Sequence, residues 1–245
     1  GDRTGRIDHF TDLCRRRTAK VRGLLRAVLN AGVQSSVDDG ALAITALVNK
    51  GNEPSLGILR NPDTLLPAVH AATFDLTEVV PLGRFSPASL HGARAVRDDD
   101  ELSAALSLIN RAHATHQLFR PFDETYFRRL EEHLPGFSRR NVWIVPGGED
   151  VQAAAIWYDP SPLFNVRVTR FPPSTRALAL AIRSIHAVTG ALYAPPRAGE
   201  AVKSLHVQAM AYRDAAAGQA LLRGVSNLTR ELGKHAYAFM VDERE

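Results

Sequence analysis

Hydrophobic positions recur at two different spacings along residues 93–241, and the spacing changes from one segment to the next. Apolar residues about three to four positions apart predict helices, and alternation predicts strands. The resulting order is strand, helix, helix, strand, strand, helix, strand, helix, strand. This order favours an α+β fold with a mixed, mainly antiparallel sheet flanked by helices. The expected strands are 93–97, 141–145, 151–158, 204–212 and 236–241, and the expected helices are 102–113, 123–133, 174–188 and 216–232.

The pattern at the start of the chain predicts one helix and one strand. Apolar positions at helical spacing indicate a helix over 18–31, with a stop at 30–32, where Asn, Ala and Gly follow one another. A turn of two Asp residues and a Gly at 38–40 then precedes an apolar strand over 41–48.

The positions of Asn, Pro and Gly, together with apolar alternation, predict the elements of residues 52–87. The segment 52–55 resembles a helix start, with Asn as the cap and Pro in the first turn. Alternating apolar residues predict two short strands within 69–80, and the Pro- and Gly-containing segment 81–87 predicts a linker. We therefore expect two domains, residues 1–91 and 92–245.

A short repeat supports two related domains. The segment Leu24–Val28 recurs as Leu221–Val225, with Gly in place of Ala at the fourth position. A helix-like segment follows each copy, and then an apolar strand, 41–48 in the first and 236–241 in the second. A match this short also arises by chance in a chain rich in Ala, Leu and Arg, so both origins stay open.

The amino-acid composition limits the classes of protein to which the chain can belong. A hydrophobic content of 45% and a charged content of 23% are ordinary for a globular domain, and no apolar run reaches the length of a membrane span. The first residues do not resemble a signal peptide. The single cysteine, Cys14, excludes an internal disulfide and favours a reducing compartment, so we expect a cytoplasmic protein without a membrane partner.

The net charge of +4 is concentrated in one basic cluster, Arg15–Arg17 with Lys20, Arg22 and Arg26. Such a cluster can meet nucleic acid, an anionic membrane or the phosphates of a small ligand, or it can be a solvated helix face. No aromatic residues interleave with it and no nucleic-acid-binding motif surrounds it, which argues against nucleic acid.

Residues 204–223 carry the most specific chemical signal. A strand leads into a turn of small residues and then a helix, and free N–H groups at a helix start bind phosphate. The segment Arg213–Gly218 resembles the acyl-CoA pyrophosphate loop of the GNAT acetyltransferases, whose pattern is Gln/Arg-x-x-Gly-x-Gly/Ala after a strand. Ala216 stands where that pattern has its first Gly. The resemblance implies cofactor-binding roles for Met210, Arg213, Ala216, Gly218 and Gln219.

The resemblance extends over about residues 94–245. Asn110–His113, Leu118–Phe122 and the order of segments resemble the opening part of a GNAT domain, and we expect this domain to lack the closing strands of the family. Residues 1–91 resemble the closing half of another such domain. Either the chain is a trimmed tandem, the arrangement we favour, or its first part completes the sheet of the second.

In the first part, Asn52 matches the family's Asn that places the CoA arm. The corresponding phosphate loop falls on 16–21, where Arg16, Ala19 and Val21 are the implied cofactor contacts and basic charge replaces glycine. Leu59 stands where the family commonly has a Tyr that protonates the leaving thiolate.

The family's reaction is a direct attack of an amine on a thioester after proton removal by a carboxylate, so Glu78 and Glu200 are the base candidates, although each is better explained as a surface carboxylate. Met210 lies where the family's backbone donor polarises the thioester. The pair His113 and His116 lacks a third ligand, so no metal is expected. Trp143, Trp157 and Tyr158 are expected to pack the hairpin.

The sequence thus predicts an acyl-CoA-dependent N-acyltransferase with acetyl-CoA as co-substrate and a small-molecule or peptide amine as acceptor, with no catalytic residue assigned. The alternative is a non-catalytic GNAT-like domain for dimerisation or ligand binding, which Ala216 and Leu59 favour. Under either hypothesis a homodimer stays open. A nucleic-acid partner of the basic cluster is a third hypothesis.

Overall fold

A computed structural model describes residues 7–10, 24–41, 43–46, 48, 52–53, 56–57, 60, 73–115, 119–148, 150–163, 166–190 and 194–242. The chain forms two compact units, residues 1–72 and 73–245. Residues 73–91 therefore belong to the second unit, whereas the sequence placed the boundary at 91/92. Within the described residues, no helix is both long enough and apolar enough to cross a bilayer.

The first unit contains a parallel strand pair and a helix. Strand β1 (Ile7–Phe10) pairs with β2 (Ala43–Ala46), which lies inside the expected strand at 41–48. Helix α1 (Leu24–Asp38) runs past the stop expected at 30–32, so that prediction is wrong. Leu29 and Ser36, two turns apart on one helix face, are both buried, and this packing carries the helix through Gly32. The relatedness of the two units stays a prediction.

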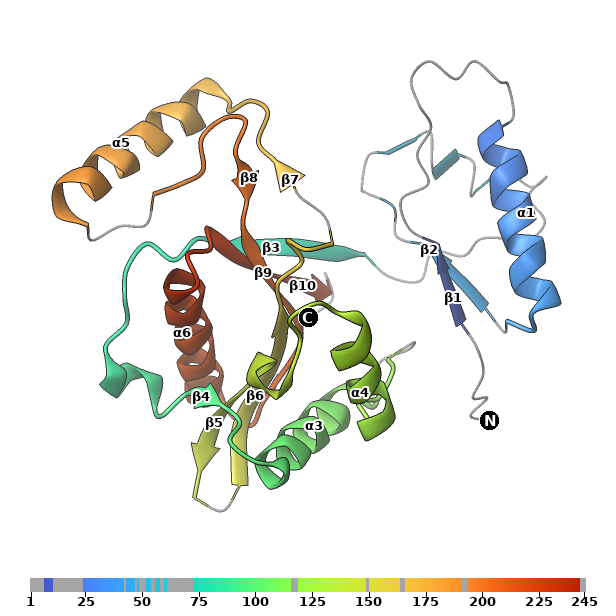
Figure 1. Cartoon of the computed structure of the whole chain (residues 1–245), viewed down its shortest axis with the longest axis horizontal. Helices are drawn as coiled ribbons and strands as arrows, with labels where there is room; N and C mark the ends of the chain where they lie inside the picture. The colour runs from blue at the N-terminus through green and yellow to red at the C-terminus, as the bar shows by residue number, and fades with distance from the viewer. Residues whose placement is uncertain are drawn as a thin grey trace. The chain divides into compact units, whose positions relative to one another are not determined.

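The second unit is built on a mixed sheet with the strand order β3-β10-β9-β6-β5-β4 (Figure 1). Only β9 and β10 pair in parallel; the other neighbours are antiparallel. The expected α+β class with a mixed, mainly antiparallel sheet is confirmed. The strands are β3 (Phe74–Val79), β4 (Arg94–Ala95), β5 (Val142–Gly147), β6 (Asp150–Tyr158), β9 (Ser204–Tyr212) and β10 (Ala236–Asp242).

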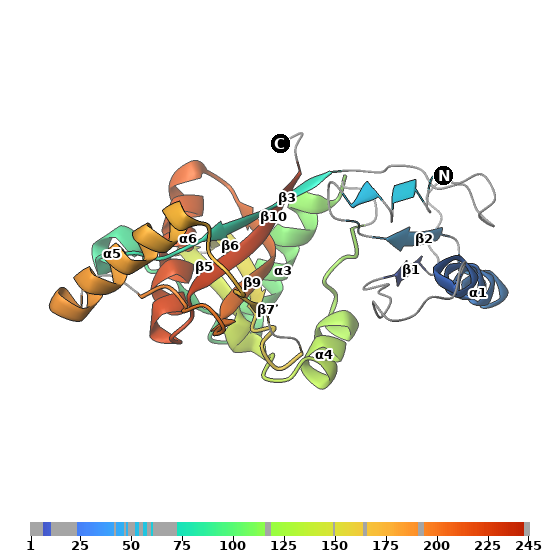
Figure 2. The same cartoon turned by 90° about the horizontal axis from the view of Figure 1, so that it is seen from above.

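Helices cover both faces of this sheet, as the two views show (Figures 1 and 2). Helices α3 (Asp99–His113) and α4 (Glu124–His133) pack on one face, where Ile109 and Ile156 are fully buried. Helix α6 (Ala215–Glu231) packs on the other, where Leu205 and Leu221 are fully buried. All four expected helices and five expected strands of residues 93–241 are present in the expected order.

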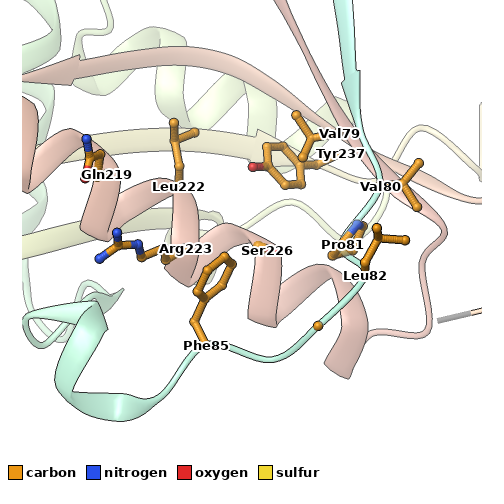
Figure 3. Close-up of a pocket in the computed structure, with 11 residues that line it drawn as sticks. Val79, Val80, Pro81, Leu82, Phe85, Gln219, Leu222, Arg223, Ser226 and Tyr237 are labelled. Carbon is orange, nitrogen blue, oxygen red and sulfur yellow. The ribbon is translucent and has the colours of Figure 1, made fainter. Parts of the chain in front are cut away.

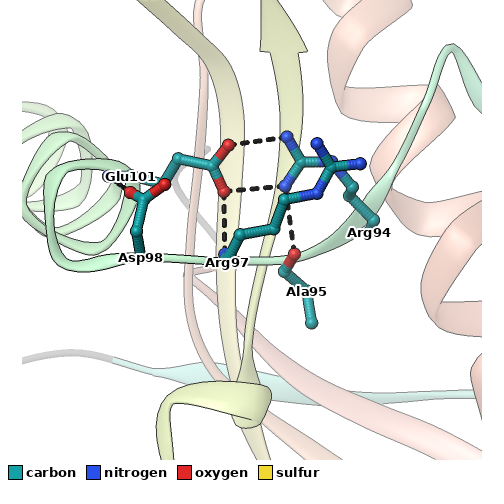
Figure 4. A network of polar contacts seen from close by, with 5 residues as sticks. All are labelled: Arg94, Ala95, Arg97, Asp98 and Glu101. Atoms are coloured by element: carbon teal, nitrogen blue, oxygen red, sulfur yellow. Dashed lines mark hydrogen bonds and ion pairs between the residues drawn. The ribbon is translucent and has the colours of Figure 1, made fainter.

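A network of charged side chains ties β4 to the start of α3 (Figure 4). Asp98 caps α3 by accepting a hydrogen bond from the Glu101 N–H at 2.9 Å. The Arg94 guanidinium donates twice to the Glu101 carboxylate, at 2.6 and 2.7 Å, and the Arg97 N–H donates to the same carboxylate at 2.8 Å. These bonds hold the pKa of Glu101 at about 2, well below its ordinary value.

The segment between β6 and β9 adds a two-stranded sheet and a helix. Strands β7 (Val166–Arg167) and β8 (Ala201–Val202) pair with each other, and α5 (Pro173–Thr189) lies between them in the chain. The sequence predicted α5 but neither of these short strands. Among the described residues of α5 only Ala179 is buried.

Strand β3 forms one edge of the sheet, although in the sequence it precedes the expected domain boundary at 91/92. It pairs with β10 over six positions, from Tyr237 opposite Val79 to Asp242 opposite Phe74. The sequence predicted two short strands within 69–80; one, β3, lies in the described part, and residues 69–72 lie outside it. The second unit thus takes its edge strand from the part assigned to the first domain.

The segment 80–86 is bonded to α6 and lies within the second unit, so the linker between domains predicted at 81–87 is not found there. The Phe85 N–H donates to the Asn227 side chain at 2.9 Å, and the Asn227 amide donates back to the Phe85 carbonyl at 3.0 Å. Arg230 donates to the Leu82 carbonyl at 2.9 Å. Polar side chains of α6 satisfy these backbone groups, and the Pro and Gly positions of the sequence do not reveal such contacts.

Candidate functional site

The central strands β9 and β10 separate part of the way along their length. They pair at three positions only, the last being His206 opposite Ala238. Beyond that pair β9 continues to Tyr212 along β6, and β10 continues to Asp242 along β3. We call the point where pairing stops the split.

A β-bulge accounts for the split. On β9, Val207 lies opposite Trp157 and Ala209 opposite Ile156, so Gln208 has no counterpart on β6. An inserted residue bends its strand and increases its local twist. The bulge comes directly after the last β9–β10 pair, so it directs the end of β9 along β6 and away from β10.

The loop predicted to bind phosphate leads from β9 into α6. The strand ends at Tyr212 and the helix begins at Ala215, as expected for a strand, turn and helix. Asp214 is the N-cap: its carboxylate accepts from the Ala217 N–H at 2.8 Å. The first turn of α6 therefore already holds an anionic group, and a phosphate bound there meets this carboxylate.

The other residues of the predicted loop have distinct environments. Arg213 is directed toward the β5–β6 hairpin: it forms an ion pair with Asp150 and donates to the Val151 carbonyl at 3.1 Å. Gly218 is buried beneath the Tyr212 ring, and a Cβ built on it would lie 3.0 Å from that ring. Ala216 and Gln219 are exposed.

A cavity of about 390 Å³ lies on the α6 face of the sheet (Figure 3). Leu222 of α6, Val79 of β3 and Phe85 of the following segment give it apolar walls. Its polar groups include Gln219 and Arg223 of α6, one and two turns into the helix. The lining residues are Val79, Val80, Pro81, Leu82, Gly83, Phe85, Gln219, Leu222, Arg223, Ser226 and Tyr237.

Arg223, one of the residues that line this cavity, is held by its surroundings. The Arg223 guanidinium lies 5.8 Å from the centre of the Phe85 ring and donates to the Ser89 carbonyl at 3.4 Å. Burial raises the pKa of the Tyr237 hydroxyl, which stays protonated near neutral pH. The cavity therefore offers an apolar wall with one positive charge and neutral polar groups beside it.

On the opposite face, four residues form a continuous row across the split end of the sheet. Glu78 of β3 lies opposite Ala238 of β10, Ala238 opposite His206 of β9, and His206 opposite Tyr158 of β6. Residues directly opposite one another project from the same face of a sheet. Tyr158 packs against the core on the α3–α4 face, so the row faces that side. We call it the Glu78–Tyr158 row.

Helices α3 and α4 add polar contacts near the end of β9. The Met210 carbonyl accepts from His113 Nε2 at 3.0 Å, so this nitrogen carries the proton. Asn110 holds the Phe122 backbone with two hydrogen bonds, at 2.8 and 3.1 Å. The Arg120 guanidinium lies 4.1 Å from the centre of the Tyr126 ring.

The structure brings together some of the residues that the sequence singled out. Met210, Arg213, Ala216, Gly218 and Gln219 all lie on β9, the turn after it or the start of α6. Glu78 lies in the row at the split, whereas Glu200 accepts from the Arg197 N–H at 2.6 Å within a local turn. Asn52 belongs to the first unit, where its carbonyl accepts from the Leu56 N–H at 3.0 Å, as at a helix start.

Several predicted residues lie outside the described part of the chain: Cys14, Arg16, Ala19, Val21, Leu59 and His116. Among the described residues, no three His, Cys, Asp or Glu side chains are grouped as a metal site would require. Trp157 is buried, as predicted for a hairpin residue, and Tyr158 is half-buried beside the core.

Sequence reasoning missed His206 and Gln208. Both are polar residues at alternate positions of an otherwise apolar strand, a pattern that indicates one polar face. Their position at the split follows from strand register and from the bulge, which the sequence pattern does not show.

Comparison with protein-family models finds no match to this chain, and comparison with curated proteins finds none either. The fold and site define an α+β protein whose mixed sheet opens between two parallel central strands beside a helix start.

Proposed function

We propose that the chain is an acyl-CoA-dependent N-acyltransferase that takes acetyl-CoA as co-substrate and transfers the acetyl group to an amine. The observation that carries the proposal is the split between β9 and β10 next to the start of α6. It adds to the resemblance between Arg213–Gly218 and the GNAT phosphate loop. The elements that precede the split also follow the family order, from β4 through α3, α4, β5 and β6 to β9.

The unpaired edge of β9 at the split is a suitable surface for a thioester that is carried on an extended arm. Where β9 leaves β10, its facing edge has no partner strand among the described residues, so backbone groups other than the Met210 carbonyl, which accepts from His113, can meet a bound chain. The arm of CoA contains amide groups, which bond to such an edge as an added strand does. A backbone N–H on this edge can also donate to the thioester oxygen as negative charge develops on it.

The α6 face supplies apolar surface and one positive charge for the remainder of the co-substrate. The 390 Å³ cavity lies along α6, and its Arg223 guanidinium can pair with a phosphate. The N–H groups at the start of α6 are the other candidate phosphate contacts. Asp214 opposes an anion there, because its carboxylate already bonds the Ala217 N–H.

Asp214 is also the observation that favours the second candidate function, a non-catalytic GNAT-like domain. A helix start that is capped by its own carboxylate, with Gly218 beneath the Tyr212 ring, is explained by packing alone. Under this hypothesis the split is a feature of the fold that serves no ligand, and acetyl-CoA does not bind.

The two functions are separated by calorimetry with acetyl-CoA and with acetyl-pantetheine, which lacks the nucleotide and its phosphates. Asp214→Asn keeps the capping oxygen and removes the charge. A carboxylate at a helix start is stabilised by about 0.3–1 kcal/mol through the helix dipole, and a bound phosphate would compete with it for that dipole. Removing the charge should therefore tighten acetyl-CoA binding about two- to fivefold and leave acetyl-pantetheine binding unchanged.

Asp98→Asn is the matched control, because Asp98 caps α3 in the same way, by accepting from the Glu101 N–H. It should change neither affinity. Absence of binding heat with acetyl-CoA for both the wild type and Asp214→Asn would overturn the transferase proposal and leave the non-catalytic domain.

A further inference from the structure

Helix α5 has an apolar face that no described part of the chain covers. Leu178, Ala181, Ile185 and Val188 follow one another at spacings of three and four residues, so they form one stripe along the helix, which we call the α5 stripe. All four are exposed: Leu178 keeps 62% of its surface, Ile185 45% and Val188 86%. Single exposed apolar residues are common on proteins, whereas a contiguous apolar surface indicates a site of contact.

The other side of α5 attaches the helix to the second unit. Ala179 is buried. Four residues later, the Arg183 guanidinium donates to the Pro195 carbonyl at 3.2 Å from Nε and at 3.1 Å from Nη2, and it also donates to the Pro196 carbonyl. Residues four apart share one helix face, and these two lie on the side opposite the α5 stripe. The stripe therefore points away from the attachment, and α5 lies apart from the sheet and from α3, α4 and α6 (Figure 1).

The part of the chain that contains α5 is basic because it lacks acidic residues. Residues 160–199 include five Arg and neither Lys, Asp nor Glu, so all 26 acidic residues of the chain lie elsewhere. Arg170 and Arg176 are exposed, and their side chains have no partner among the described residues. An anionic partner is therefore attracted to the same segment that presents the apolar stripe.

We propose that α5 lies on an anionic lipid surface, with the α5 stripe in the boundary between headgroups and acyl chains and the arginines of 160–199 against lipid phosphates. An apolar helix face combined with basic residues around it is the usual form of a helix that lies in a membrane interface. The negative surface potential of anionic lipids attracts each arginine near it. This inference is independent of the proposed function.

The sequence led us to expect no membrane partner, because no apolar run is long enough to span a bilayer. The described helices agree with that observation. An interfacial helix needs no such run, since it lies in the plane of the membrane surface. For α5, the inference therefore replaces the earlier expectation.

Charge and side-chain type favour lipid over two other occupants of the α5 stripe. A second copy of the chain would bring two segments of the same positive charge together, and like charges across an interface oppose association. Nucleic acid is bound by aromatic and hydrogen-bonding side chains beside basic ones, whereas the large exposed side chains of α5 are aliphatic.

Co-sedimentation of the full chain with lipid vesicles tests the inference. Vesicles of phosphatidylglycerol and phosphatidylcholine in equal parts are compared with vesicles of phosphatidylcholine alone. The chain should bind the anionic vesicles at least about tenfold more tightly. Raising NaCl from about 0.1 M to about 1 M should release much of the bound protein, because the Debye length falls from about 10 Å to about 3 Å.

The contribution of the stripe is measured by replacing two of its side chains. Leu178→Ser combined with Ile185→Ser should weaken vesicle binding about tenfold or more, because two apolar side chains no longer enter the lipid. The matched control is Leu76→Ser combined with Met240→Ser. These two residues lie opposite each other on β3 and β10 and are 57% and 56% exposed, so the control should bind like the wild type. Circular dichroism checks that each variant is folded.

The contribution of charge is measured with a second pair of variants. Arg170→Gln combined with Arg176→Gln should weaken binding to the anionic vesicles about tenfold or more. Arg129→Gln combined with Arg140→Gln removes the same charge from exposed positions outside 160–199 and should have little effect. The basic cluster Arg15–Arg26 keeps its charge in all of these variants, so its own attraction to lipid is the same in each.

Entry of α5 into the lipid is followed by fluorescence. In Val188→Trp, the new indole replaces the most exposed side chain of the stripe. Its emission should shift to shorter wavelength with anionic vesicles and stay unchanged with phosphatidylcholine alone. The emission of Trp143 and Trp157, measured on the wild type, is subtracted.

The inference is overturned if the wild type does not bind anionic vesicles, if Leu178→Ser with Ile185→Ser binds them equally well, or if the Val188→Trp emission does not shift. A dimer that this double serine variant loses, without vesicle binding, would instead assign the stripe to a second copy. Retention on DNA that Arg170→Gln with Arg176→Gln loses, again without vesicle binding, would assign the segment to nucleic acid. No acyl-CoA enters these measurements, so every result leaves the transferase proposal to its own test.

Discussion

The Arg94–Glu101 ion pair makes the stability of the second unit depend on pH in a way that one substitution removes. Glu101→Gln keeps the size of the side chain and one oxygen for the Arg97 N–H, but it loses the charge that receives both Arg94 bonds (Figure 4). The variant should therefore be less stable at neutral pH, and the difference should shrink in acid.

The magnitude follows from the pKa of Glu101. A pKa that falls from 4.5 to about 2 on folding corresponds to about 3 kcal/mol at most, at about 1.36 kcal/mol for each pH unit. The Arg94 and Glu101 side chains keep 25% and 24% of their surface exposed, so solvent screening reduces this to about 1–2 kcal/mol. Because the folded-state pKa is lowered, this stability is complete above the unfolded pKa and is lost as the pH falls toward 2.

Urea unfolding followed by circular dichroism between pH 7 and pH 3 measures the effect. The free-energy difference between the wild type and Glu101→Gln should be about 1–2 kcal/mol at pH 7 and should fall steadily below about pH 5. Glu124→Gln is the matched control: Glu124 pairs with Arg128 at 2.6 Å but is 86% exposed, so its loss should cost less than about 0.5 kcal/mol. A difference for Glu101→Gln that stays constant over this pH range would refute the reasoning.

The remaining predictions concern the packing of α6 and of the segment before it. In Gly224→Val, a Cβ would lie 3.0 Å from both the Ala93 Cβ and the Trp143 ring, so thermal unfolding should show a loss of about 1–3 kcal/mol; a stability equal to wild type would mean that the Trp143 ring moves freely. Asn227→Ala removes both hydrogen bonds to the Phe85 backbone and should cost about 1–3 kcal/mol in urea unfolding, with faster amide exchange at Phe85. Unchanged exchange there would show that the segment 80–86 is held by other contacts.

Most of the second unit could be predicted from the sequence, because its elements are long and their apolar spacing is regular. The strand 204–212 matches β9, and α6 covers 215–231 where a helix over 216–232 was expected. The errors have local causes. Burial of one face carries α1 through Gly32, and side chains of α6 hold the segment expected to be a linker.

The candidate site, too, could be predicted from the sequence only in part. The turn of small residues after β9 was visible in the sequence as a possible phosphate loop, since a helix start and its small residues are adjacent in the chain. That the sequence places Asp214 in this loop was visible, but the structure decided that it caps the helix and bonds the Ala217 N–H, because a cap depends on the backbone angles of a single residue.

By itself, the sequence determined the order of the helices and strands, the α+β class and the position of the β9–α6 turn, because each depends on residues a few positions apart. Only the tertiary structure decided that β3 is the edge strand, that β9 and β10 separate after His206, and that Glu78, His206 and Tyr158 share one face. Strand order sets the first and strand register the other two, and both depend on how segments distant in the chain fit together. A shift of one residue in register would turn every side chain of a strand to the opposite face.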